Sequence, residues 1–215
     1  MRFANRVEAG RALAERLQAF AGRDDVVVLG LPRGGVPVAA EVARALVAPL
    51  DVLLVRKLGA PGQPELAIGA IAEGGVRLVN EDILLSLGMD LAEIDRVVAD
   101  EQPELERRLH AYRGDRPAVA VAGRIVIVVD DGLATGASMD AACRAVAARG
   151  VARLIVAVPV AAREACERLR AVAHEVVAVA TPSPFWAVGA WYADFQQTTD
   201  EQVVEALAAA VPPPR

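Results

Sequence analysis

Short Val- and Ile-rich runs alternate with longer Ala-rich runs along most of this sequence, and that alternation constrains the fold more than any other feature. The runs 26–29, 125–129, 154–158 and 176–180 are apolar throughout, which is typical of strands buried on both faces. The first three are followed by stretches with apolar residues at helical spacing. We therefore predict an α/β fold: an open, mostly parallel twisted sheet with helices on both faces and right-handed crossovers.

Three segments lie outside this pattern. Residues 81–113 are charged, with Leu and Val at helical spacing, and the pattern is interrupted near Gly88; we predict a short and then a long helix, a helical insertion packed on the core. Residues 181–199 are loop-rich and hold both tryptophans, so we expect a small hood. Residues 211–215 predict a disordered tail. The whole chain, 1–215, is expected to form a single domain.

Composition limits the classes of partner. The net charge of −5 argues against a nucleic-acid or membrane-surface binder, which is usually basic. The N-terminus shows no signal-peptide core, and the longest uncharged stretch, 176–193, is interrupted by Pro and Gly, so we expect a soluble, cytoplasmic protein. Cys143 and Cys166 show no metal-ligand spacing and are expected to be small buried apolar residues.

The most informative loop follows the run 125–129. Asp130 and Asp131 come first, then a turn of small residues that leads into a helix. Such a turn can offer backbone N–H groups and a helix N-terminus to a phosphate, with Thr135 and Ser138 adding hydroxyls. The acids suit sugar hydroxyls or Mg²⁺ beside it. We therefore expect a phosphorylated sugar and an exposed acid pair; the alternative is an acidic turn before a helix.

This segment resembles the 5-phosphoribosyl-1-pyrophosphate (PRPP) signature of the phosphoribosyltransferases over about 13 consecutive positions. The resemblance spans roughly residues 26–180 and is strongest to bacterial stand-alone members of undefined acceptor. It implies that Asp130 and Asp131 contact the ribose, and Mg²⁺ through PRPP hydroxyls or water. It also implies a PRPP-binding loop that holds the 5-phosphate, formed by Gly132, Ala134, Thr135, Gly136, Ala137 and Ser138.

Two further segments match the family by position. Arg33, Gly34 and Gly35 resemble its pyrophosphate loop, which implies a non-proline cis peptide near Arg33; an ordinary turn is the alternative. Arg56 and Lys57 are predicted to end a strand at 51–55 and to open a Gly/Pro loop at 58–65, where the family has a mobile loop. The resemblance implies that they bind PRPP; the alternative is two solvated basic residues.

The hood offers candidates for acceptor binding. Four of the eight aromatic residues of the chain lie between Phe185 and Tyr192; they either pack the loop on the core or form a stacking wall for a planar base. The family builds its base-recognition hood here, which implies base-binding roles for Phe185, Trp186 and Asp194. Ala134 stands where the 6-oxopurine members place an acid, so we expect hypoxanthine and guanine to be poor acceptors.

Taken together, the resemblance implies a Mg²⁺-dependent phosphoribosyltransferase that moves the phosphoribosyl group of PRPP to a nitrogenous base or similar small-molecule acceptor and releases pyrophosphate. Arg33, Lys57, Asp130 and Asp131 are then the catalytic candidates, and a homodimer is a possible assembly. The main alternative is a non-catalytic regulator of the same fold that senses PRPP or a nucleotide. The basic end of the long helix, 107–113, is expected to complement the helix dipole; a contact with phosphate from the same or a neighbouring subunit is the alternative.

Overall fold

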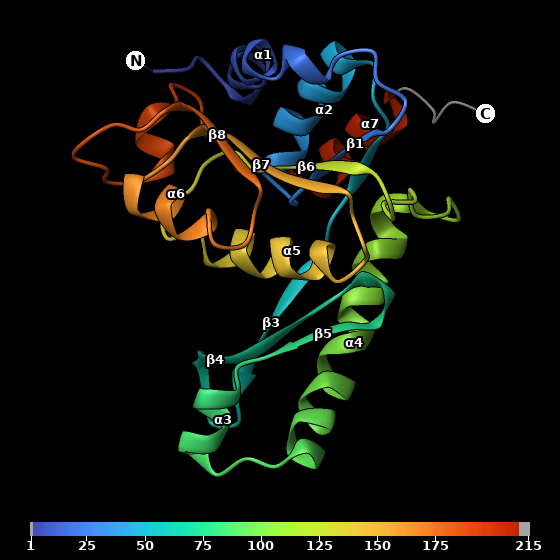
Figure 1. Cartoon of the computed structure of the whole chain (residues 1–215), viewed down its shortest axis with the longest axis vertical. Helices are drawn as coiled ribbons and strands as arrows, with labels where there is room; N and C mark the ends of the chain where they lie inside the picture. The colour runs from blue at the N-terminus through green and yellow to red at the C-terminus, as the bar shows by residue number, and fades with distance from the viewer. Residues whose placement is uncertain (1, 211–215) are drawn as a thin grey trace.

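The computed structural model describes residues 2–210, which form two sheets and the helices around them (Figure 1). The larger sheet has five parallel strands in the order β2-β1-β6-β7-β8. Its strands are β1 (Val26–Gly30), β2 (Leu50–Val52), β6 (Ile125–Val129), β7 (Arg153–Val160) and β8 (Glu175–Ala180). The predicted parallel sheet is therefore confirmed.

Alternate residues of the central strands enter two separate cores. Val26 and Val28 of β1 belong to one buried cluster, whereas Val27 and Leu29 belong to the other. This division follows from the period of two in a strand, and it explains why these strands are apolar at every position.

Helices cover both faces of this sheet, as predicted (Figure 1). One face carries α1 (Arg6–Arg16), which continues into a 3-10 turn at Gln18–Phe20, together with α2 (Gly35–Leu46) and α7 (Asp200–Ala208). The other face carries α5 (Ala137–Ala147) and α6 (Arg163–Leu169). Cys143 and Cys166 lie in this second pair of helices and are buried, as expected.

The second sheet departs from the prediction at its first strand and at the hairpin that follows it. Its antiparallel strands are β3 (Val55–Ala60), β4 (Gln63–Ala72) and β5 (Val76–Val79), with a 3-10 turn at Glu73–Gly75. The predicted strand 51–55 ends early, and the predicted loop 58–65 is instead a hairpin. Pro61 and Gly62 form the tight turn, while Leu58 and Ala60 are buried on one side of β3. Alternating burial of this kind stabilises a strand despite Gly and Pro nearby.

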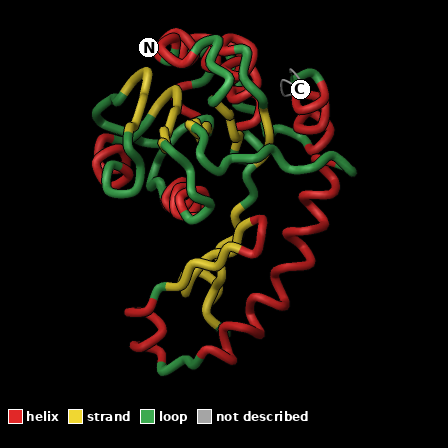
Figure 2. Tube along the Cα trace, turned by 45° about the vertical axis from the view of Figure 1, so that its right-hand side comes forward, coloured by secondary structure: helices red, strands yellow, loops and turns green. Residues whose placement is uncertain are grey.

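The helices α3 (Glu81–Leu87) and α4 (Leu91–Arg113) confirm the prediction of a short and a long helix. Gly88 ends α3, and Asp90 starts α4 with a capping box in which Asp90 and Glu93 satisfy each other's backbone N–H. We call residues 55–113 the arm, because β3–β5, α3 and α4 extend together away from the parallel sheet (Figure 2).

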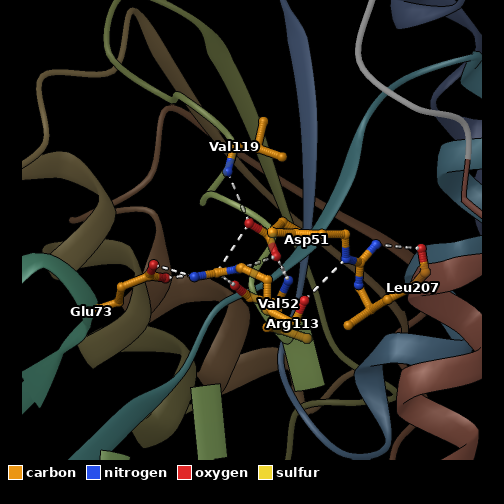
Figure 3. Close-up of polar contacts among 7 residues, drawn as sticks. Asp51, Val52, Glu73, Arg113, Val119 and Leu207 are labelled. Carbon is orange, nitrogen blue, oxygen red and sulfur yellow. Dashed lines mark hydrogen bonds and ion pairs between the residues drawn. The ribbon is translucent and has the colours of Figure 1, made fainter. Parts of the chain in front are cut away.

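A buried ion cluster joins the arm to the parallel sheet (Figure 3). The Arg113 side chain, only 9% exposed, lies 3.0 Å from Asp51 of β2 and donates to Glu73 at 2.9 Å. Asp51 also accepts the Val119 N–H. The expectation that this end of the helix only complements the dipole is therefore incomplete, because Arg113 is a structural ion-pair partner.

No helix within residues 2–210 combines the length and apolarity needed to cross a bilayer. The predicted tail, 211–215, lies outside the described residues.

Candidate functional site

The acid pair lies at the carboxyl end of β6, where ligands bind in parallel sheets. The chain then runs through Gly132 and Leu133, both buried, to an exposed stretch at Ala134 and Thr135. Helix α5 begins at Ala137, and its N-cap residue Gly136 has no side chain to satisfy the first backbone N–H groups. These donors and the exposed Ser138 can therefore meet an anion.

The loop after β1 packs directly against the acid pair. A Cβ atom added to Gly34 would lie 2.1 Å from Asp131 Oδ2, and one added to Gly35 would lie 2.8 Å from Asp130 Cα. Only glycine fits at either position. The contact arises because β1 and β6 are neighbours in register, Gly30 beside Val129. The two loops singled out from the sequence therefore form one site, although about 95 residues of chain separate them.

The Pro32–Arg33 peptide bond is cis, as the resemblance implied. The Arg33 guanidinium lies 3.7 Å from Asp200 Oδ1 at the start of α7, and the buried Tyr112 hydroxyl of α4 donates to the same oxygen at 2.6 Å. Burial and the hydrogen bond to Asp200 raise the pKa of Tyr112 to about 12. Arg33 is thus held from the side of α4 and α7.

The acid pair is largely buried, and the expectation of an exposed loop was wrong. The Asp131 side chain is 14% exposed and forms an ion pair with Arg6 at 2.8 Å. Asp130 Oδ1 accepts the Asp131 N–H at 2.8 Å. Burial, together with the neighbouring Asp131 carboxylate, raises the pKa of Asp130 to about 8. The exposure was overestimated because the hood and α1, distant in sequence, cover the pair.

The two basic residues of β3 point to different neighbours. Arg56 forms an ion pair with Glu101 of α4. Lys57 is exposed and lines a cavity of about 610 Å³ between α5 and the second sheet, together with Ala137 and Ser138 at the start of α5. The structure therefore brings Lys57, but not Arg56, to the cavity beside the start of α5.

The hood candidates differ in exposure. Phe185 packs partly against buried residues of the core, so packing accounts for that ring. Trp186 is 81% exposed and is free to meet a ligand. Asp194 is exposed and accepts the Gln196 N–H at 3.1 Å, while its own N–H donates to Ala4 O. The 3-10 turn Val188–Trp191 is the only helical turn assigned within 181–199.

Sequence reasoning missed the residues that hold the acid pair. Arg6 comes from α1, and the buried Tyr192 of the hood donates its hydroxyl to Asp131 O at 2.6 Å. Val188 is so close to Gly132 that an added Cβ there would lie 2.5 Å from it. One signal was present in the sequence: Arg6 begins a helix, where the dipole disfavours a cation.

Within residues 2–210, no group of three or more His, Cys, Asp or Glu side chains is placed to hold a metal by itself. Mg²⁺ usually binds one or two carboxylates and completes its shell with water and substrate oxygens. Asp130 fits that requirement, since a ligand would supply the remaining oxygens.

An acid pair beside a glycine loop and a helix N-terminus, all at the carboxyl edge of a parallel sheet, defines an α/β protein with a candidate ligand site at that edge. The model of the phosphoribosyl transferase domain matches residues 4–194. The chain belongs to this family.

Named relatives agree with the assignment. Two curated proteins of Mycobacterium tuberculosis, provisionally named phosphoribosyl transferases, are each 50% identical over 97% of this chain. The match covers 47% of their length, so the chain spans about half of these relatives. The crystal structure of TT1426 from Thermus thermophilus is 52% identical, with a TM-score of 0.86 over 96% of this chain and 98% of that one.

A more distant structure, the AQ2163 protein from Aquifex aeolicus, shares the fold with a TM-score of 0.51 at 11% identity, over 96% of this chain and 85% of that one.

Proposed function

We propose that this chain transfers the phosphoribosyl group of PRPP to a nitrogenous acceptor and releases pyrophosphate. The observation that carries the proposal is the contact between the two loops: Gly34 and Gly35 lie against Asp131 and Asp130 with no room for a side chain. A ligand bound at the acid pair therefore reaches the N-termini of both α2 and α5. PRPP carries phosphate groups at both ends of its ribose, which matches an acid pair flanked by the start of α5 on one side and by Arg33 and Gly34 on the other.

In this proposal each part of PRPP has its own partners. The start of α5, with Thr135 and Ser138, binds the 5-phosphate, and Asp130 binds the ribose hydroxyls. Gly34, Gly35 and Arg33 face the pyrophosphate. Mg²⁺, held by Asp130 through ribose hydroxyls or water, supplies charge neutralisation when bound.

The reaction breaks the bond between ribose C1 and a pyrophosphate oxygen and forms one between C1 and the acceptor nitrogen. Negative charge builds on the leaving group, and the Arg33 guanidinium offsets it. Asp130 holds the ribose in place, so that C1 stays between leaving group and acceptor. Lys57 of β3, which lines the cavity beside the start of α5, adds positive charge near the 5-phosphate.

The test is a screen of purine, pyrimidine and nicotinate-like acceptors with PRPP and Mg²⁺, in which pyrophosphate release is measured. We expect turnover with at least one acceptor and its loss in Asp130→Asn. Hypoxanthine and guanine are expected to be poor acceptors, because the Ala134 methyl cannot polarise a ring nitrogen. Tight PRPP binding without turnover on any acceptor would instead favour a PRPP-sensing regulator.

For the acceptor itself we propose the hood, with the exposed Trp186 stacking on a planar ring and Asp194 accepting from a ring N–H or amino group. Base stacking on an aromatic ring contributes about 1–3 kcal/mol in nucleic-acid complexes. Trp186→Ala should therefore raise the KM of the acceptor much more than that of PRPP, whereas an equal rise in both would contradict this role.

A further inference from the structure

The guanidinium of Arg6 contacts both the acid pair and the hood. Its Nε and Nη2 atoms both lie 2.8 Å from Asp131 Oδ2. Its Nη1 donates to the Gln196 carbonyl at 2.7 Å, and its Cζ lies 4.1 Å from the centre of the Phe195 ring. Because one planar group makes all these contacts, the positions of Asp131 and of residues 195–196 depend on each other.

The place of Arg6 in its helix needs an explanation. It is the first residue of α1, where the partial positive charge of the backbone N–H groups disfavours a cation. Its side chain is only 13% exposed, so it is not there to face solvent. The Asp131 carboxylate offsets both the unfavourable helix dipole and the lost solvation of the guanidinium. Removing either partner would therefore leave the other as an unpaired, largely buried charge.

The two acids are not equivalent. Asp131 Oδ2 accepts from Arg6 on one side and faces the Gly34 backbone on the other, where an added Cβ would lie 2.1 Å away. That oxygen is enclosed. Asp131 thus sets the position of its loop through its contacts with Arg6 and the Gly34 backbone.

The hood is fastened to the same turn of chain by groups other than Arg6. The Tyr192 hydroxyl donates to Asp131 O at 2.6 Å, and Val188 contacts Gly132. The segment before α1 is also tied to the hood, since Phe3 N donates to Trp191 O and Phe3 O accepts from Ala193 N. A shift of Asp131 on ligand binding must therefore pass to the hood.

We propose that Arg6 is a positioning residue of the PRPP site, which fixes Asp131 for ligand binding and couples the acid pair to hood residues 188–196. The proposal rests on the proposed function, because it takes PRPP as the ligand of the acid pair. It adds a residue from the N-terminal helix to the site and predicts that filling one end of the site moves the other.

The experiment compares Arg6→Gln with Arg11→Gln. Arg11 lies on the same helix and pairs with Glu41, but its side chain is 69% exposed and it is remote from the acid pair. PRPP with Mg²⁺ is the probe, and calorimetry measures its affinity. Both tryptophans of the chain lie in the hood, so tryptophan fluorescence reports on the hood alone.

We expect PRPP to change the tryptophan fluorescence of the wild type and of Arg11→Gln equally. In Arg6→Gln, PRPP affinity should fall about tenfold or more, and the fluorescence response at saturating PRPP should be lost. Adding Asp131→Asn to Arg6→Gln should cost little further affinity, because the pair acts as a unit.

Arg6→Lys serves if Arg6→Gln does not fold. It keeps the charge but cannot contact Asp131 and Gln196 together, so it should recover part of the affinity without the fluorescence response. Wild-type PRPP affinity in Arg6→Gln would overturn the proposal. Arg6→Lys would overturn it if both its PRPP affinity and its fluorescence response to PRPP matched those of the wild type. The proposal would also be overturned if bound PRPP left the tryptophan fluorescence of the wild type unchanged. A wild type that does not bind PRPP at all contradicts the proposed function instead.

Discussion

At the scale of single residues, the site places an acid in surroundings that disfavour its charge. Asp130 is covered by its neighbours, and both its burial and the adjacent Asp131 carboxylate raise its pKa. Arg6 offsets this effect only in part. Such a residue costs stability and is retained where binding or catalysis needs it, which is why strongly shifted acids mark functional sites.

Replacing Asp130 by Asn should stabilise the fold while weakening PRPP binding. The folded-state pKa of Asp130, about 8, lies above its usual value of 3.8. The part of the free energy of unfolding that depends on protonation of Asp130 is therefore fully present at low pH, and it is lost as the pH rises through about 8. The gain in Tm of Asp130→Asn over wild type should grow from about pH 4 to about pH 8. Thermal unfolding across this range measures it, and a gain that is constant with pH would contradict the assignment.

Arg33→Ala should reduce turnover by about 10²–10³, the usual cost of removing one fixed donor from a charge-stabilising site. Lys57→Ala should have the smaller effect, because Lys57 is exposed on β3 rather than part of a glycine loop. Arg44→Ala is the control, since Arg44 is an exposed residue of α2 that pairs with Glu41 of the same helix. Steady-state kinetics of pyrophosphate release would measure all three. Wild-type turnover in Arg33→Ala would contradict the proposal that Arg33 faces the pyrophosphate.

At the scale of elements, the arm and the parallel sheet meet at one buried cluster. Arg113 at the end of α4 faces Asp51 of β2 and Glu73 after β4, and each of the three side chains is at most 15% exposed. Three elements from separate parts of the chain thus share one cation (Figure 3). Removing that cation leaves two carboxylates buried and uncompensated, which costs much more than the intact pair contributes.

Arg113→Met should lower the free energy of unfolding by about 3–5 kcal/mol. Arg107→Met is the matched control: Arg107 lies on the same helix and pairs with Glu104, but it is 66% exposed, and its loss should cost about 0–1 kcal/mol. Adding Glu73→Gln to Arg113→Met should recover part of the loss, because one uncompensated charge disappears. Urea unfolding would decide, and equal effects of the two Met variants would show that the cluster does not hold the arm.

At the scale of the whole molecule, the protein has two parts with different degrees of burial (Figures 1 and 2). All five residues of β1 and of β6 are buried between helices. In the arm, all four residues of β5 are only half-buried, and Leu85 and Leu91 near the α3–α4 turn are 80% and 71% exposed. Regions with fewer buried contacts open at lower free energy than the rest.

Hydrogen exchange should therefore distinguish the two parts. Amides of β4 and β5 should exchange faster than those of β1 and β6 under native conditions, since the arm can open while the parallel sheet stays folded. Mass spectrometry of peptic fragments would measure it. Equal protection of β5 and β6 would show that the molecule unfolds as one cooperative unit.

The sequence by itself determined the periodic elements and the loop that joins β6 to α5. Uninterrupted apolar runs require strands buried on both faces, and Asp130, Asp131 and the small residues after them are neighbours in the chain, so their grouping needs no tertiary contact.

The hairpin β3–β4 was missed because Pro and Gly also occur in long loops, and only packing of Leu58 and Ala60 selects the strand. Arg6 and Asp131 are 125 positions apart, and Tyr112 and Asp200 are 88 apart. Local periodicity carries no information about which distant side chains meet, so only the tertiary structure, by placing α1, the hood and the arm around the sheet, decided what holds the acid pair and Arg33.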